Sequence, residues 1–210
     1  MNLLLSFLLF FAQQEDPLSS SDRIAFTNRL NERFQTNEQN RRRSTYNPDR
    51  YRNLSLRGRN EVRKLAWDAY RNGQIAKQLL PEYTDRAIRS GKFVMPFTLE
   101  KRGKKPADGW PVVIAMHGGG GVPKKVNDDQ WKIMQRYYRI SNCLYIAPRA
   151  PTDHWNGFYT DYVYPLMERL IRALNLFGKI DSNRIYLIGY SHGGYGAFAI
   201  GPKMADRFAA

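Results

Sequence analysis

The segment from Gly189 to Gly193 matches the pattern G-x-S-x-G, with Ser191 at its centre. A short apolar run over 184–189 precedes the serine, and a helical pattern over 192–200 follows it. Small residues two before and two after a serine let the chain turn sharply from strand to helix, so that the hydroxyl projects from the sheet. The N-terminus of the following helix directs free N–H groups toward a developing oxyanion. Ser191 is therefore the predicted nucleophile of an acyl-transfer site.

A second glycine-rich segment, from His117 to Gly121, follows the apolar run 112–116. Glycine lets a backbone approach a reacting carbonyl closely, and a loop placed after such a strand supplies N–H donors to the oxyanion. No G-K-[ST] sequence follows the run, which disfavours a phosphate-binding loop. The predicted oxyanion donors are the backbone N–H of Gly119, with Gly118 and Gly120 as alternatives, and that of His192.

Residues 181–210 carry a resemblance to a known superfamily. The stretch DSNRIYLIGYSHGGYGAF at 181–198, continued by MADRFAA at 204–210, resembles the nucleophile region of α/β-hydrolase superfamily serine esterases. It is similar to the branch holding polyhydroxybutyrate-depolymerase-like, feruloyl-esterase-like and prolyl-oligopeptidase-like enzymes, and the likeness extends over 111–210. The resemblance implies an α/β-hydrolase fold and catalysis through an acyl-enzyme on Ser191, which water then hydrolyses.

The acid and base that such a serine needs are not found in the residues that follow it. In the α/β-hydrolase fold the chain order is serine, then Asp or Glu, then histidine. Residues 192–210 contain one acid, Asp206, and no histidine besides His192. Asp206 is expected to be structural, because it lies where a helix leads to the next strand. We therefore expect a C-terminally truncated part of a longer enzyme, inactive alone, whose strand before Ser191 is left as an unpaired sheet edge.

Four side chains near these motifs are candidates for lining a substrate pocket: His117, Trp155, Asp161 and Tyr190. His117 is expected to brace the glycine loop rather than to act as a base. Trp155, together with Phe158 and Tyr159, is explained equally well as core packing around the next helix, and His154 fits a pocket or a surface loop equally. The three histidines lack metal-ligand spacing with acids or cysteine, so neither a metal nor a cofactor is expected.

Apolar patterning predicts three buried strands that alternate with helices. The strands are expected over 112–116, 144–147 and 184–189, and the helices over 128–140, 162–176 and 192–200. This alternation predicts an α/β fold with a mostly parallel sheet and right-handed crossovers, the three-layer sandwich of an α/β-hydrolase, incomplete at its C-terminus. Upstream, one amphipathic helix begins near Glu61, a second covers 75–80 and is ended by Pro81, and 92–99 is an extended edge segment because it contains Pro96.

The first 60 residues divide into two segments by composition. Residues 1–12 contain an apolar run that is too short to span a bilayer and is typical of a signal peptide, with an uncleaved membrane anchor as the alternative. Residues 13–60 are polar and basic, include Arg41-Arg42-Arg43, and are expected to form a flexible linker. A helical extension is expected over 61–91 and the hydrolase part over 92–210. The protein is therefore expected to be secreted or periplasmic.

The composition is that of a globular protein, with 42% hydrophobic residues and a formal net charge of +14 over 210 residues. It excludes global disorder. The basic balance is interpreted as a solvated tail with no specific nucleic-acid partner, and weak contact of the N-terminal arm with anionic surfaces is the alternative. Cys143, the only cysteine, lies in an apolar run and is expected to be a buried, inert thiol.

Together these features favour a serine esterase that acts on a small-molecule or polymeric ester. The serine turn alone does not separate ester from amide substrates, so a serine peptidase of prolyl-oligopeptidase type is one alternative. A non-catalytic, basic surface-binding protein with a degenerate hydrolase domain is the other.

Overall fold

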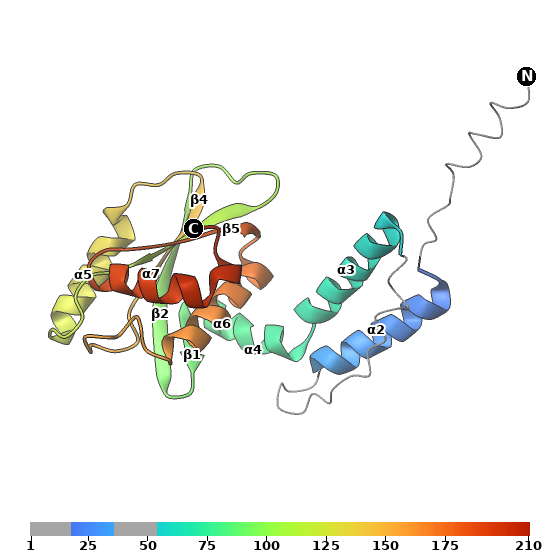
Figure 1. Cartoon of the computed structure of the whole chain (residues 1–210), viewed down its shortest axis with the longest axis horizontal. Helices are drawn as coiled ribbons and strands as arrows, with labels where there is room; N and C mark the ends of the chain where they lie inside the picture. Colours follow the sequence, from blue (N-terminus) through green and yellow to red (C-terminus); the bar gives the residue numbers. More distant parts are fainter. Residues whose placement is uncertain (1–17, 36–53) are drawn as a thin grey trace, which may run out of the picture. The chain divides into compact units, whose positions relative to one another are not determined.

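The computed structural model describes residues 18–35 and 54–210 and divides the chain into two compact units, residues 1–77 and 78–210 (Figure 1). The predicted signal peptide at 1–12 and the triplet Arg41-Arg42-Arg43 lie outside the described residues. In the described part of the chain, no helix is both long and apolar enough to cross a membrane.

The first unit contains helices α2 (Ser20–Gln35) and α3 (Leu56–Arg71). They contact each other through the rings of Phe34 and Tyr70, whose centroids are 5.5 Å apart, and Ser55 caps α3 by accepting a hydrogen bond from the Gly58 N–H at 2.9 Å. The prediction of a flexible linker over 13–60 is therefore wrong where the structure describes that segment. The reason is that α2 packs on α3, a contact that the polar composition of the segment did not indicate.

Helix α4 (Gln74–Thr84) continues through Pro81 instead of ending there, which corrects the predicted boundary. A proline inside a helix removes one N–H donor but not a carbonyl acceptor. The Pro81 carbonyl still accepts a hydrogen bond from the Asp85 N–H at 2.8 Å. The helix therefore tolerates the proline in its last turn, where few intrahelical bonds remain to be lost.

The second unit is built on a five-stranded sheet in the order β1-β2-β4-β3-β5. Strand β3 runs parallel to β4 and β5, whereas β2 runs antiparallel to β1 and β4. The fold is therefore of the α/β class, and the predicted parallel strands are confirmed. The strands are β1 (Ala87–Ser90), β2 (Phe93–Arg102), β3 (Trp110–Met116), β4 (Cys143–Pro148) and β5 (Ile180–Gly189).

The segment predicted as a sheet edge at 92–99 is β2, which lies between β1 and β4 and is not an edge. Strand β1 was not predicted; a tight turn at Gly91, with φ of 55°, folds it back onto β2. Pro96 is accommodated because it pairs with Ala87 at the end of the short β1 ladder, and its carbonyl accepts a hydrogen bond from the Arg149 N–H at 2.7 Å.

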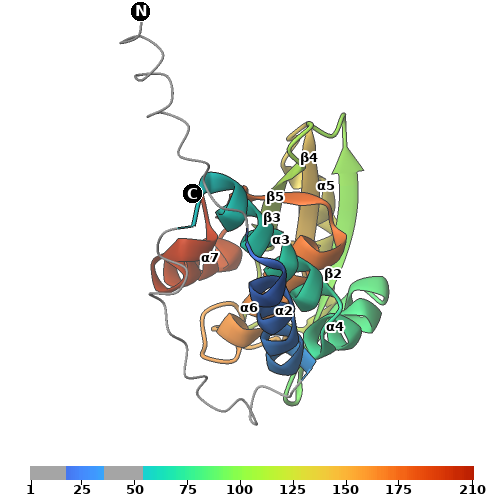
Figure 2. The same ribbon diagram turned by 90° about the vertical axis from the view of Figure 1, so that its right-hand side faces the viewer.

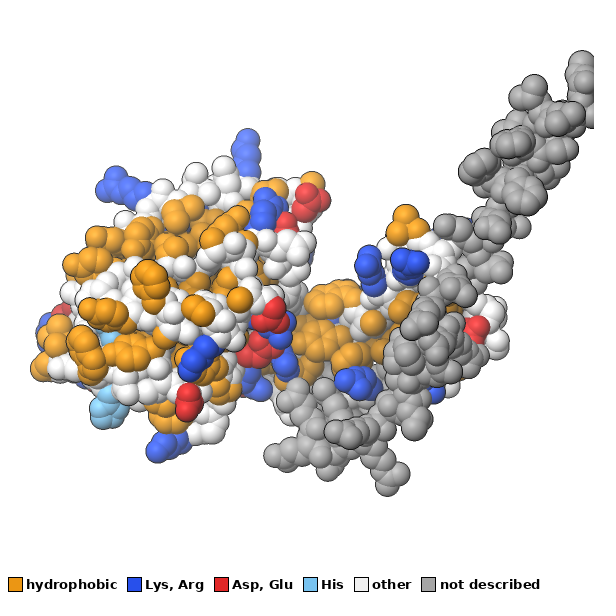
Figure 3. All heavy atoms as spheres, viewed as in Figure 1, with side chains coloured by type: hydrophobic (Ala, Val, Ile, Leu, Met, Phe, Trp, Pro, Cys, Tyr) orange, Lys and Arg blue, Asp and Glu red, His pale blue; other side chains and the backbone are white. Residues whose placement is uncertain are grey.

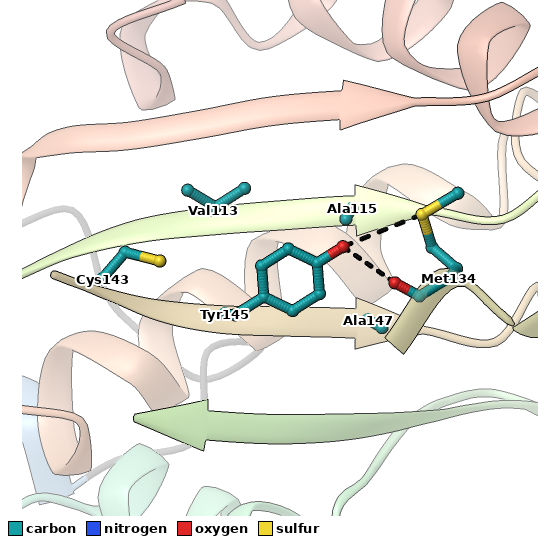
Figure 4. Packing of buried hydrophobic residues seen from close by; sticks show 6 residues of the cluster. All are labelled: Val113, Ala115, Met134, Cys143, Tyr145 and Ala147. Carbon is teal, nitrogen blue, oxygen red and sulfur yellow. Dashed lines mark hydrogen bonds between the residues drawn. The ribbon is translucent and has the colours of Figure 1, made fainter. Parts of the chain in front are cut away.

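Helices cover both faces of the sheet, as the alternation of side chains along the strands requires. On one face α5 (Lys124–Tyr137) packs on Val113, Ala115 and the β4 residues beside them (Figure 4). There the Tyr145 hydroxyl donates a hydrogen bond to the Met134 carbonyl at 2.8 Å. On the other face lie α6 (Val163–Phe177) and α7 (His192–Lys203), which Figure 2 shows on the same side of the strands.

Cys143 is buried in the α5 face of the core, as predicted, and its burial raises the pKa of the thiol. An apolar environment disfavours the thiolate, which is the reactive form of cysteine. The prediction of an inert thiol is consistent with this environment.

The outer edge of β5 is partly paired, in contrast to the fully unpaired edge that was predicted. The Ala209 N–H donates to the Ile185 carbonyl at 2.8 Å, and the Leu187 N–H donates to the Ala210 carbonyl at 2.9 Å. Asp206, in the short 3-10 helix before these residues, is exposed and pairs with Arg207 at 3.6 Å. Its place on the surface agrees with the structural role predicted for it.

The central strand β4 provides a stability test. Ile146 is completely buried, so Ile146→Ala is expected to lower the free energy of unfolding by about 2–5 kcal/mol through lost apolar contacts and a residual cavity. Phe198→Ala removes a larger side chain that is 86% exposed, and it should change stability by about 0.5 kcal/mol or less. Urea denaturation of both variants measures the difference; equal losses would show that Ile146 is not in the core.

Candidate active site

Ser191 occupies a strained turn between β5 and α7. Its φ is 50° and its ψ is −116°, a backbone conformation that residues other than glycine rarely adopt. The chain can turn this sharply only because its neighbours are glycines. A Cβ at Gly189 would lie 2.1 Å from the Gly193 carbonyl oxygen, and one at Gly193 would lie 2.2 Å from the Met116 carbonyl oxygen. The strand–turn–helix context predicted for this serine is therefore present, and the serine itself is exposed.

The buried ring of His117 holds the start of the glycine loop through hydrogen bonds, as the sequence predicted. Its Nδ1 lies 2.6 Å from the Gly118 carbonyl oxygen, and its Nε2 accepts a hydrogen bond from the Ala150 N–H at 3.0 Å. Because Nε2 is an acceptor, the proton of the neutral ring is on Nδ1, which donates to Gly118. Burial and, to a smaller extent, the charge of Arg149 lower the pKa of His117 to about 4 despite that bond. With both nitrogens occupied, His117 neither lines a pocket nor serves as a base.

Asn127 holds the other end of the same loop. Its side chain is buried, and its Oδ1 accepts a hydrogen bond from the Gly120 N–H at 2.9 Å. Its Nδ2 lies 3.1 Å from the Gly120 carbonyl oxygen and 3.2 Å from that of Val122. The Gly120 N–H is thus occupied, which removes Gly120 from the three predicted oxyanion donors in this loop. Sequence reasoning missed Asn127, because an asparagine at the start of a helix has many ordinary explanations.

Three of the backbone N–H groups predicted to stabilise an oxyanion remain available, two in the glycine loop and one at the start of α7. Within residues 18–35 and 54–210, the backbone N–H groups of Gly118, Gly119 and His192 donate no hydrogen bond. Gly119 has a φ of 109°, and a Cβ there would lie 2.2 Å from the Asn127 Oδ1. His192 is the first residue of α7, where N–H groups have no partner inside the helix.

The side chain of His192 is 1% exposed and packs among aromatic rings. Its centroid lies 5.2 Å from that of Phe158 and 6.0 Å from that of Tyr159. Within the described part of the chain, both of its ring nitrogens lack a hydrogen-bond partner. Burial lowers the pKa of His192, so the ring is neutral near pH 7.

Arg149 and two aspartates connect the elements behind the loop. The Arg149 Nε lies 3.0 Å from an Asp128 oxygen of α5, and its Nη2 pairs with Asp153 in the loop after β4. Asp153 also accepts a hydrogen bond from Asn127 Nδ2 at 2.9 Å. Burial alone would raise the pKa of Asp153, but the hydrogen bonds from Arg149 and Asn127 outweigh it and lower that pKa. The carboxylate is therefore ionised, and one of its oxygens accepts both hydrogen bonds.

The other predicted pocket residues lie in different surroundings. Trp155 is 61% exposed, and its ring is 5.9 Å from that of Tyr195 on α7. Tyr190 is half exposed and lies 5.5 Å from Tyr137. Figure 3 shows hydrophobic side chains over much of the face of the second unit on which α7 lies in Figure 1. Asp161 is exposed and lies just before the N-terminus of α6.

The sequence left open whether the aromatic residues after β4 line a pocket or pack in the core, and the structure gives a different answer for Phe158 than for Trp155. Phe158 is completely buried and belongs to the core, where its ring lies edge-on to His117 at 5.0 Å. Trp155 is exposed beside the first turns of α7. His154 is also exposed, which favours the surface-loop interpretation of this residue.

A separate hollow of about 590 Å³ lies between β2 and the C-terminal end of α5, and Arg102 lines it. The Arg102 guanidinium donates to the carbonyls of Tyr138 at 2.6 Å and Gln135 at 2.7 Å, which are unpaired acceptors at the end of α5. It also lies 3.7 Å from the centroid of the Tyr145 ring. Arg102 is thus explained as a helix cap. In the residues that the structure describes, no group of three or more side chains is arranged to hold a metal ion.

No family model matches the chain, and no curated protein matches it. Among solved structures it is similar to one described as the crystal structure of a thermostable esterase, at 26% sequence identity and a TM-score of 0.42. The match covers 58% of this chain and 37% of that chain, so this chain spans well under half of that protein.

The glycine loop gives a matched pair of variants. Gly119→Ala puts a Cβ 2.2 Å from Asn127 Oδ1 at a φ of 109°, whereas Gly121→Ala has its nearest neighbour 3.6 Å away. We expect Gly119→Ala to lower the free energy of unfolding by at least about 1–3 kcal/mol through backbone strain, and Gly121→Ala to change it by less than about 0.5 kcal/mol. Denaturant titration of both variants measures this. Equal stabilities would contradict the loop conformation.

The buried neutral histidine makes stability depend on pH. The pKa of His117 is about 4 in the folded protein and about 6.5 in the unfolded chain, so the unfolded state binds more protons between these values. The free energy of unfolding is therefore expected to be highest above pH 6.5 and to fall by roughly 3 kcal/mol, through His117 alone, as the pH drops to about 4. His192 contributes in the same direction.

Denaturant titrations at several pH values between 4 and 7 measure this slope. His117→Gln retains an acceptor but no titrating ring, so its slope should be smaller than that of the parent chain. An unchanged slope would assign the pH dependence to other groups.

Proposed function

We propose that this chain belongs to a serine hydrolase of the esterase type, with Ser191 as the nucleophile. The observation that carries the proposal is the turn of Ser191, held at a φ of 50° between a parallel strand and a helix, with an exposed side chain. Strain of this kind is costly and is maintained where it serves a function. A serine on a strand-to-helix turn after a parallel strand is typical of the α/β-hydrolase nucleophile.

The position of the glycine loop supports the same function. The loop follows β3, and β3 lies next to β5, the strand that leads to Ser191. The Tyr190 N–H donates to the Met116 carbonyl at 3.2 Å, so the two segments meet at the carboxyl ends of adjacent strands. An α/β-hydrolase takes one oxyanion donor from the loop after its third strand and one from the residue after the nucleophile. Here these donors would be Gly119 and His192, whose N–H groups have no partner among the described residues.

In the proposed reaction the Ser191 Oγ attacks the carbonyl carbon of an ester. The carbonyl oxygen gains negative charge, which the N–H groups of Gly119 and His192 stabilise. The alcohol leaves with a proton, and water then releases the acid from the acyl-enzyme. The rings of Trp155, Tyr190 and Tyr195 offer apolar surface beside the serine for the acyl or alcohol part. A base must still accept the Ser191 proton, and His117 is not that base because both its nitrogens are hydrogen-bonded.

Reaction with a fluorophosphonate probe tests the proposal, because a formed oxyanion hole accelerates attack by its serine even where no base activates that serine, so labelling is expected to be slow but selective. We expect one adduct on the protein, located at Ser191 by peptide mass spectrometry and absent from Ser191→Ala. Ser182→Ala, an exposed serine at the start of the same strand, is the control and should be labelled like the parent chain. No adduct, or one at another serine, would favour a non-catalytic protein with a degenerate hydrolase domain.

A further inference from the structure

The Asn127 side chain on α5 makes four hydrogen bonds, two of them to Gly120 of the glycine loop. It is 1% exposed and lies in the first turn of the helix. One oxygen and one NH₂ group serve four partners: the N–H and carbonyl of Gly120, the carbonyl of Val122 and the carboxylate of Asp153. The amide orientation is unambiguous, because one partner is a donor and the other three are acceptors.

This clamp determines which N–H groups of the loop are left for a ligand. Because Asn127 bonds both the N–H and the carbonyl of Gly120, the peptide groups on either side of Gly120 cannot rotate freely. Gly119, the preceding residue, has a φ of 109°, and a Cβ on it would lie 2.2 Å from Asn127 Oδ1. Its own N–H has no partner within residues 18–35 and 54–210. His117 fixes the start of the loop at Gly118 in the same way. The loop is thus pinned on both sides of Gly119.

The clamp is itself held in place by charge. Asp153 accepts hydrogen bonds from Asn127 and Arg149, and Arg149 is also paired with Asp128, the residue after Asn127. Arg149 is 7% exposed, whereas the side chains of Asp128 and Asp153 are 29% and 37% exposed, so these pairs join a buried guanidinium to two partly exposed carboxylates. The first turn of α5, the glycine loop and the loop after β4 are therefore joined by one network of hydrogen bonds and ion pairs.

We propose that Asn127 is a positioning residue of the active site, which selects Gly119 rather than Gly120 as the oxyanion donor. The inference rests on the proposed function of Ser191. Asn127 acts through the loop and does not touch the reacting atoms. A backbone donor displaced by about 1 Å loses much of its effect on a transition state, so the clamp controls the rate of the chemical step rather than substrate affinity.

The test uses two substitutions of different severity. Asn127→Asp retains an acceptor for the Gly120 N–H but loses the NH₂ donors and places a second carboxylate beside Asp153. Asp153→Asn leaves Asn127 in place and removes only the charged group that anchors it. We expect the maximal rate of fluorophosphonate labelling at Ser191 to fall on the order of 10- to 100-fold in Asn127→Asp and by less in Asp153→Asn. The probe concentration at half-maximal rate should stay unchanged in both.

Asn175→Ala is the matched control, since Asn175 is a half-buried asparagine on α6 that donates to the Ile171 carbonyl at 3.0 Å. It should label at the parent rate. Hydrogen exchange followed by mass spectrometry gives a second readout that does not need a reactive serine. The peptide containing Gly118 to Gly121 should exchange faster in Asn127→Asp, and peptides of α6 should not.

The outcomes separate the two proposals. Unchanged labelling and unchanged exchange in Asn127→Asp would overturn the positioning role, even though Ser191 reacts. A parent chain that does not label would overturn the proposed function and with it the catalytic meaning of the clamp, while exchange would still show whether Asn127 orders the loop. Equal falls in rate in Asn127→Asp and Asn175→Ala would mean that lost stability, not positioning, explains the effect.

Discussion

A close backbone contact between the end of β3 and the turn at Ser191 sets the geometry of the candidate site. The Tyr190 N–H bonds the Met116 carbonyl, and Gly193 passes so near the same carbonyl that a Cβ there would lie 2.2 Å from its oxygen. Met116 and Tyr190, which are 74 positions apart in the chain, thus meet through their backbones without intervening side chains. Because β3 and β5 are adjacent parallel strands, both segments leave the sheet at the carboxyl ends of these strands. Every feature assigned to the site depends on this contact.

The glycine loop next to that contact is held by polar groups that are themselves buried. Buried donors and acceptors are costly when they are unpaired, so a network in which each is satisfied has one favoured arrangement. His117 bonds the first glycine and the Ala150 N–H, and Asn127 bonds the third glycine and Asp153. The loop therefore does not need bulky side chains to be ordered. Its glycines keep the backbone accessible while neighbouring elements supply the rigidity.

His192 differs from these residues, because its buried ring has no hydrogen-bond partner in the described part of the chain. The ring instead fills the space between the loops, lying against Gly120 and Gly157 and among the rings of Phe158 and Tyr159. The residue thus has two separate functions in the architecture. Its backbone begins α7 beside Ser191, and its side chain packs the loop after β4 onto that helix.

Much of the fold was predictable because local patterns decided it. The buried strands β3, β4 and β5 are short apolar runs, and the serine turn requires glycines at fixed spacing, so both were recognised. The errors concern packing between segments. The hairpin of β1 makes β2 an internal strand, α2 packs on α3 within a segment that composition alone described as a linker, and Pro81 sits in a last turn that tolerates it.

The sequence alone determined the serine turn, the glycine loop and the alternation of strands and helices, because each depends on the types and spacing of neighbouring residues. Only the tertiary structure decided which loop amides are free, since that depends on Asn127 and His117, whose partners lie on other elements. It also separated exposed Trp155 from buried Phe158, three residues away in one loop. Hydrogen bonding and burial are properties of the packed chain, and no local pattern encodes them.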